Sequence, residues 1–363
     1  MRSVRSLRAT RRWAAVWALA LCAATAVPAM ETPATAAAAT SATATSSGSP
    51  YTVSPVAGSL SGYRISGVYV AGVSSGGYMA GQLQVAYSSR IRGTAVFGAG
   101  PYYCAENNAA EALYGCAANT YPDYLGTLEA DASLWSAYGW IDPIGNLSGK
   151  PVWVYHGSQD TTIAASVSRD GAAFWSDFGA KVTSVTGTGA GHAWVTPYGT
   201  NTCATTGSPY LDNCGTDPEH DLLTKMLGSV AAENTGPLTG TLTRFDQSAY
   251  AVGGSAGALD MSGAGFAYVP HSCATGSSCR LLVALHGCSQ GYDSVGTAFV
   301  DRANLDQYAD TNAMIVLYPQ ATTGASNPYG CWDWWGYLGA TNYPIQGGAQ
   351  IETIMNMVDA LGG

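Results

Sequence analysis

Short apolar runs alternate with amphipathic stretches along the chain from about residue 65 onward. The runs are rich in Val, Ile, Leu and Tyr, and they predict strands at 67–70, 94–97, 151–155, 182–185, 281–285 and 314–318. The stretches between them predict helices at 78–87, 165–178, 299–308 and 351–361. Buried strands separated by helices are typical of a mostly parallel sheet with helices on both faces. The pattern therefore predicts an α/β fold.

The first 50 residues do not follow this alternation. An arginine-rich start precedes an apolar stretch at 13–27, and small residues follow it, which is the pattern of a secretory signal. A membrane anchor is the alternative, but the apolar run is short for a membrane span. We therefore expect residues 1–29 to be a signal peptide. The Ala-, Thr- and Ser-rich residues 30–50 are expected to be a disordered leader, and residues 51–363 a single domain.

The charge balance excludes some classes of partner. The chain has 15 Lys and Arg against 24 Asp and Glu, a formal net charge of -9, and every acidic residue lies beyond position 30. Nucleic-acid binding calls for a basic face, and an acidic protein adheres poorly to anionic membranes. We expect a secreted, extracellular monomer that binds no nucleic acid and has no membrane anchor.

The cysteine count suggests disulfide bonds. Nine cysteines are present, and leaving out Cys22 of the signal segment gives an even number, which in an exported chain favours disulfides. No CxxC pair or Cys/His cluster is present, so we expect neither a redox role nor a metal site. Many pairings are open; joining nearest neighbours gives Cys104–Cys116, Cys203–Cys214, Cys273–Cys279 and Cys288–Cys331.

Two G-x-S-x-G elements are candidates for a serine nucleophile. The first, 72–76, follows the strand GVYVAG and precedes the helical sequence YMAGQLQVAY, which is the setting that a nucleophile elbow requires. The second, 253–257, has no helix after it and is expected to be a loop. We take Ser74 as the nucleophile, with an ordinary Gly-rich turn as the alternative. The backbone N–H of Ser75 would then supply one donor of an oxyanion hole.

A serine hydroxyl needs a base and a residue that orients the base. Among the five histidines, His192 lies in a Gly-rich loop after a strand and is the best candidate for the base. The other four are more simply interpreted as structural or solvent-exposed residues: His156, His220, His271 and His286. Asp160 follows the strand at 151–155 by a short loop. The non-catalytic alternatives are that His192 is a histidine of a surface loop and that Asp160 is an aspartate of a turn. The chain order Ser74, Asp160, His192 is that of an α/β-hydrolase, which supports all three together.

One element is out of the usual order. The strand LLVAL and the following His286-Gly287-Cys288 look like an α/β-hydrolase oxyanion loop, which should precede the nucleophile in the chain. Joining the C-terminus to the start of the domain restores the usual order. We therefore expect a circularly permuted α/β-hydrolase, a change that compact domains tolerate when their termini are neighbours.

The segments GVSSGGYMA, VALHGCSQ, MIVLYPQAT and GCWDWW, together with the His-Gly-Ser-x-Asp element, resemble the extracellular poly(3-hydroxybutyrate) depolymerases. The permuted order is similar to that of the fungal single-domain type. The resemblance runs from about Tyr51 to the C-terminus. It implies a disulfide-stabilised catalytic domain with a Ser74–Asp160–His192 triad.

The resemblance also implies a set of supporting residues. The backbone N–H groups of Ser75 and Cys288 would form the oxyanion hole, and Cys288 would be bonded to Cys331. Trp332 would be an aromatic wall for the substrate, and Asn327 would occupy a subsite position.

The predicted activity is hydrolysis of polyhydroxyalkanoate esters through an acyl-enzyme, without cofactor or metal. The partner would be a solid polyester, bound through exposed Tyr, Leu and Trp side chains around the cleft. The alternatives are a feruloyl or acetylxylan esterase, which would share the triad, and an inactive surface-binding homologue.

Overall fold

The computed structural model describes residues 50–120, 124–186 and 189–363. All of them fall in one structural unit, Ser47–Gly363. The predicted signal peptide and leader lie outside the described residues, except for residue 50. No described helix is both long and apolar enough to cross a membrane.

Twelve strands are found among the described residues. They are β1 (Val56–Ala57), β2 (Ile65–Val73), β3 (Ile91–Phe97), β4 (Pro151–His156), β5 (Lys181–Thr186), β6 (Trp194–Val195), β7 (Asn201–Thr202), β8 (Leu211–Asn213), β9 (Thr241–Asp246), β10 (Ala264–Val269), β11 (Cys279–Leu285) and β12 (Met314–Tyr318). Nine of them form a central sheet in the order β1-β9-β10-β12-β11-β2-β3-β4-β5. The six strands from β12 to β5 are parallel, whereas β10 is antiparallel to β9 and β12. The mostly parallel sheet predicted from the sequence is therefore confirmed.

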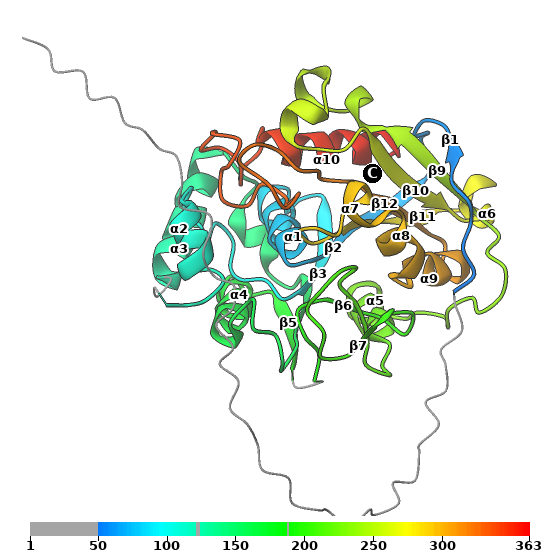
Figure 1. The fold of residues 1–363 in the computed structure, drawn as a ribbon. Coiled ribbons are helices and arrows are strands. Elements are labelled where there is room, and N and C mark those ends of the chain that lie inside the picture. Colours follow the sequence, from blue (N-terminus) through cyan, green and yellow to red (C-terminus); the bar gives the residue numbers. More distant parts are fainter. Residues whose placement is uncertain (1–49, 121–123, 187–188) are drawn as a thin grey trace, which may run out of the picture. The chain divides into compact units, whose positions relative to one another are not determined.

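The helices lie on both faces of this sheet (Figure 1). The α-helices are α1 (Ser75–Ala86), α2 (Ala109–Tyr114), α3 (Leu125–Tyr138), α4 (Ala165–Asp177), α5 (Pro218–Leu227), α6 (His271–Ala274), α7 (Tyr292–Val295), α8 (Ala298–Arg302), α9 (Leu305–Thr311) and α10 (Ala349–Ala360). Alternate strand residues join two separate cores because successive side chains point to opposite faces. Val70 belongs to the core that includes buried residues of α1, α4 and α10, while its neighbour Ala71 belongs to the core that includes residues of α5, α8 and α9.

The strand order explains the unusual chain position of His286-Gly287-Cys288, the sequence expected to form an oxyanion loop. Starting at β9, the chain runs through β10, β11, β12 and α10, and the sheet continues from β11 directly into β2. The C-terminus reaches the start of β2, where the Tyr63 N–H donates to the Leu361 carbonyl at 2.8 Å. The strands that would come first in an unpermuted hydrolase thus come last in this chain. The end of the chain and the segment before β2, which would be covalently continuous in an unpermuted hydrolase, are joined here by a hydrogen bond.

Several features differ from the pattern predicted from the sequence, which did not include helix α3 or the small sheet β6-β8-β7. The helix predicted at 299–308 is two helices, α8 and α9, because Asn304 between them has a left-handed backbone with φ of 56°. The antiparallel strands β9 and β10 were not predicted. β9 has only two buried side chains, Leu242 and Phe245, separated by more exposed positions, so its sequence lacks a continuous apolar run.

Candidate active site

Ser74 lies at a sharp turn between β2 and α1. Its φ of 57° and ψ of −124° are unusual for a residue with a side chain, and such strain is characteristic of a nucleophile elbow. The turn needs small neighbours because the start of α1 passes close to β11. A Cβ on Gly76 would overlap the carbonyl oxygens of Leu285 and His286. The glycines of the G-x-S-x-G element are therefore explained by tight backbone packing around Ser74.

The second G-x-S-x-G element has a different structure. Ser255 is exposed and lies between two short 3₁₀ segments, Val252–Gly254 and Gly257–Leu259. No strand enters the turn at Ser255 and no α-helix follows it in this described part of the chain. Its expected assignment as a loop is confirmed.

Asp160 and His192 meet at the carboxyl edge of the parallel sheet. Asp160 follows β4, and His192 lies in the loop after β5. The two atoms Asp160 Oδ2 and His192 Nδ1 are 2.8 Å apart, and both side chains are nearly buried, with 2% and 7% exposure. The backbone N–H of His192 donates to Thr206 Oγ1 at 2.9 Å. These contacts fix the imidazole with one nitrogen on the carboxylate and leave Nε2 for another partner.

The environment of Asp160 favours its charged form. Burial by itself would raise the pKa of this carboxyl, but hydrogen bonding and charge interaction with His192 lower it. The other oxygen, Oδ1, accepts the backbone N–H groups of Thr162 and Ile163 at 2.8 and 2.9 Å. The net effect is a pKa below the ordinary value. Asp160 is therefore ionised at neutral pH and holds the proton of His192 on Nδ1.

Ser74 and His192 line a common cavity of about 200 Å³. Its wall is formed by Val73, Ser74, Thr162, His192, Ala193, Thr206, Tyr210, Gly287, Cys288, Ser289, Gln290 and Tyr329. Asp160 is not part of this wall and lies behind the imidazole. The cavity thus presents a serine and a histidine, and it keeps the orienting carboxylate away from its surface.

The loop after β11 closes the cavity beside Ser74. A Cβ placed on Gly287 would lie 3.3 Å from the Ser74 Cβ, which shows how closely the loop approaches the serine. Ser75 is the first residue of α1, where backbone N–H groups have no intrahelical acceptor and the helix dipole favours negative charge. Ser75 and Cys288 therefore flank the serine from two elements, β2–α1 and β11.

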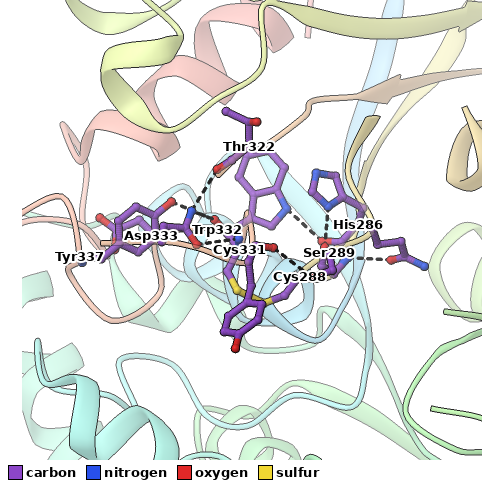
Figure 2. The surroundings of a disulfide bond; sticks show 12 residues. His286, Cys288, Ser289, Thr322, Cys331, Trp332, Asp333 and Tyr337 are labelled. Carbon is purple, nitrogen blue, oxygen red and sulfur yellow. Dashed lines mark hydrogen bonds between the residues drawn. A yellow bond between two sulfur atoms is a disulfide. The ribbon is translucent and has the colours of Figure 1, made fainter. Parts of the chain in front are cut away.

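All four disulfides that nearest-neighbour pairing predicts are bonded in the structure: Cys104–Cys116, Cys203–Cys214, Cys273–Cys279 and Cys288–Cys331. The last bridge ties the loop after β11 to the segment that contains Cys331 (Figure 2). The Asn327 carboxamide binds both the N–H and the carbonyl of Cys331, each at 2.8 Å. This clamp fixes the far end of the bridge.

Neither Trp332 nor Asn327 lies at the cavity surface, which corrects the role expected for each. Both side chains are fully buried, with 0% exposure. The Trp332 indole N–H donates to the His286 carbonyl at 3.0 Å, so the ring is bound to the backbone at the end of β11 (Figure 2). The exposed aromatic side chain at the cavity is instead Tyr329, with 60% exposure. Trp332 and Asn327 support the loop from behind.

The remaining histidines occupy structural or surface positions. His156 and His286 are buried, and their ring nitrogens bind backbone groups. His220 and His271 are exposed near the starts of α5 and α6. Only His192 is paired with a carboxylate at a serine-lined cavity among the described residues.

Gln290 and the loop residues Thr206 and Tyr210 were not singled out from the sequence. Gln290 is buried, accepts the Gly287 N–H at 2.7 Å, and donates to the carbonyls of Pro209 and Tyr210 at 3.1 and 2.9 Å. Its position in the segment HGCSQ, two residues after Cys288, could have identified it as a residue of this loop. Thr206 and Tyr210 had no such signal; they lie in the loop that the Cys203–Cys214 bridge closes.

No group of three or more His, Cys, Asp or Glu side chains suited to a metal ion is found in the ranges that the structure describes.

Comparisons with known proteins agree on one family. No protein-family model matches the chain. A polyhydroxybutyrate depolymerase from Talaromyces funiculosus is 40% identical over 299 residues, 77% of this chain and 85% of that protein. A poly(3-hydroxybutyrate) depolymerase from Delftia acidovorans is 37% identical over 288 residues, and the match spans 57% of its length.

Two solved structures also match the fold. They are the crystal structure of a PHB depolymerase from Penicillium funiculosum and a Ser-to-Ala PHB depolymerase complexed with an R3HB trimer. Each is 39% identical with a TM-score of 0.77, and the match covers 84% of this chain and 98% of the solved one.

Proposed function

Since the chain belongs to the poly(3-hydroxybutyrate) depolymerase family, we propose that it hydrolyses the ester bonds of poly(3-hydroxybutyrate) or related polyhydroxyalkanoates. The observation that carries the proposal is the 2.8 Å bond between His192 Nδ1 and Asp160 Oδ2 at the cavity that Ser74 lines. A serine, an oriented histidine and a buried carboxylate are the groups that acyl transfer requires.

The proposed reaction begins with Ser74. His192 Nε2 takes the proton from the Ser74 hydroxyl while Oγ attacks the ester carbonyl and forms a tetrahedral oxyanion. The C–O bond to the alcohol portion then breaks, and His192 returns the proton to the leaving oxygen. Water, activated by the same imidazole, hydrolyses the acyl-enzyme and releases the acid. Asp160 stays ionised throughout and stabilises the imidazolium.

The proposed oxyanion hole consists of two backbone donors. The Ser75 N–H comes from the start of α1, and the Cys288 N–H comes from the loop after β11. Backbone donors held in place before the reaction stabilise developing charge without reorganisation, and removing one such donor slows kcat by about 10²–10³-fold in comparable sites.

Exposed aromatic side chains are proposed to hold the enzyme on solid polymer. Tyr329 lies at the cavity with 60% exposure, and large exposed side chains also occur on α2, on α3 and beside them: Leu113, Tyr114, Tyr124, Leu134, Tyr138 and Trp140. The rings of Tyr138 and Trp140 are 5.2 Å apart. Such amphipathic rings suit a wet apolar surface. Trp140→Ser is expected to slow clearing of polymer and leave hydrolysis of a soluble trimer unchanged.

The location and oligomeric state of the enzyme are also part of the proposal. We propose that a signal peptide at residues 1–29 exports the protein from the cell, where disulfides persist. We also propose that the enzyme is a monomer. The proposed reaction uses only protein groups and water.

The experiment that tests the substrate class compares soluble esters. Wild-type protein, Ser74→Ala and the matched serine control Ser255→Ala are assayed on a 3-hydroxybutyrate trimer and on feruloyl and acetyl sugar esters. We expect rapid cleavage of the trimer by the wild type and Ser255→Ala, with a loss of about 10⁶-fold in kcat for Ser74→Ala. Preferential cleavage of the sugar esters would replace the proposed substrate with that of a carbohydrate esterase.

A further inference from the structure

His286 is a buried histidine next to the proposed oxyanion donor. It follows β11, has 0% exposure, and immediately precedes the residues Gly287 and Cys288. Its two ring nitrogens both have backbone partners. Nδ1 lies 2.7 Å from the Gly287 carbonyl oxygen, and Nε2 lies 3.0 Å from the Ala321 nitrogen.

These two contacts determine which ring nitrogen carries the proton. A backbone N–H is always a donor, so Nε2 must accept from Ala321 and must be unprotonated. The proton of the neutral imidazole is then on Nδ1, which donates to the Gly287 carbonyl. Burial lowers the pKa of His286 to about 4, so this neutral form persists at the pH values where the His192 base is needed.

The Gly287 carbonyl belongs to the same peptide unit as the Cys288 N–H. In a trans peptide the carbonyl and the N–H point in opposite directions, so fixing one fixes the other. The Gly287 carbonyl also accepts the Gln290 N–H at 3.3 Å, and the Gly287 N–H is held by the Gln290 side chain at 2.7 Å. Of these contacts, the bond from Nδ1 is the shortest to the carbonyl itself.

We propose that His286 is a positioning residue that holds the Gly287–Cys288 peptide with its N–H directed at the oxyanion, by donating Nδ1–H to the Gly287 carbonyl. Ala321 fixes the tautomer that makes this donation possible. The proposal rests on the oxyanion hole proposed above. It assigns His286 no contact with the substrate, since the ring is buried behind the loop.

Two substitutions of His286 distinguish the roles of its two ring nitrogens. His286→Asn places a carboxamide N–H near the Nδ1 position, so it retains a donor to Gly287 and loses the acceptor for Ala321. His286→Gln reaches the Nε2 position, so it retains the acceptor and loses the donor. Tyr268→Phe is the matched control. Tyr268 lies on β10, outside the cavity wall, and the change removes a hydroxyl that donates to Asp310 and accepts the Gly240 N–H.

We expect His286→Gln to lower kcat on a soluble trimer by about 10²-fold, the effect of losing one oxyanion donor, with little change in KM. His286→Asn is expected to stay within about tenfold of the wild type, and Tyr268→Phe to lose stability without losing kcat. Equal activity of the two His286 variants would overturn the proposal. Activity surviving in Ser74→Ala would instead overturn the proposed nucleophile.

A second measurement does not depend on the His286 variants folding. In ¹⁵N-histidine protein carrying His192→Asn, NMR should show one slowly exchanging imidazole with the proton on Nδ1. His156 does not interfere, because its Nε2 faces the Ile163 carbonyl at 2.8 Å and is expected to carry its proton there. A buried ring protonated on Nε2 alone, with no Nδ1–H ring present, would contradict the proposal.

Discussion

Gly98 limits the space behind the proposed Asp160–His192 pair. It has φ of +53°, and an added Cβ would lie 2.9 Å from Asp160 Oδ2 and 3.1 Å from His192 Nδ1. An ordinary contact begins at about 3.4 Å, so Gly98→Ala has to displace the carboxylate by about 0.5 Å and the imidazole by about 0.3 Å. The backbone cannot easily move away, because the Gly98 N–H donates to the Tyr155 carbonyl at 2.9 Å.

The expected effect has two parts. A left-handed backbone with a Cβ costs about 1–2 kcal/mol of stability. A misplacement of about 1 Å in a catalytic group costs about 10²-fold in rate, so a shift of half that size should reduce kcat by about 10- to 100-fold. Since the displaced atoms orient the base and do not touch substrate in the proposed reaction, KM should change little.

The matched control is Gly139→Ala. Gly139 has φ of +71° at the end of α3, and an added Cβ would have no neighbour within 4 Å. It should lose a similar amount of stability by thermal melting and keep full kcat on the soluble trimer. If Gly98→Ala were as active as Gly139→Ala at equal stability, the Asp160–His192 contact would not be the one that catalysis uses.

Two further predictions concern the oxyanion loop. Replacing Cys288 and Cys331 together by Ala removes a bridge across 43 residues and should lower the free energy of unfolding by up to about 4 kcal/mol in urea titrations, with a fall in kcat because the loop is released; unchanged kcat would show that the bridge does not position the loop. Because the pKa of His286 falls from 6.5 to about 4 on folding, its contribution to stability is complete above pH 6.5 and is lost as the pH falls to 4, by about 3 kcal/mol. Urea unfolding at pH 7 and pH 4 should show this loss in the wild type and not in His286→Asn, and an equal pH dependence in both would refute it.

The residues predicted for the triad share a signal that sequence can carry. Ser74, Asp160 and His192 each follow a parallel strand, and the carboxyl ends of parallel strands meet at one edge of the sheet. The circular permutation could also be inferred, because the sequence His286-Gly287-Cys288 stands after the predicted nucleophile in the chain. Local sequence was sufficient wherever the position of a residue followed from the strand that precedes it.

The inward or outward direction of loop side chains could not be predicted in the same way. Trp332 was expected at the substrate, but its indole N–H is satisfied by a backbone carbonyl that is distant in sequence. Thr206 and Tyr210 line the cavity from the loop that the Cys203–Cys214 bridge closes. The direction of these side chains depends on contacts between segments that are distant in sequence. A local pattern of apolar and polar residues therefore does not predict it.

The central claim is that Ser74 attacks the ester bonds of a solid polyester. The most direct test is the clearing of a turbid poly(3-hydroxybutyrate) suspension, with release of acid, by the wild type, Ser74→Ala and Ser255→Ala. The account predicts clearing by the wild type and by Ser255→Ala, and none by Ser74→Ala. Clearing by Ser74→Ala, or no clearing by a wild-type protein that still cleaves soluble esters, would contradict it.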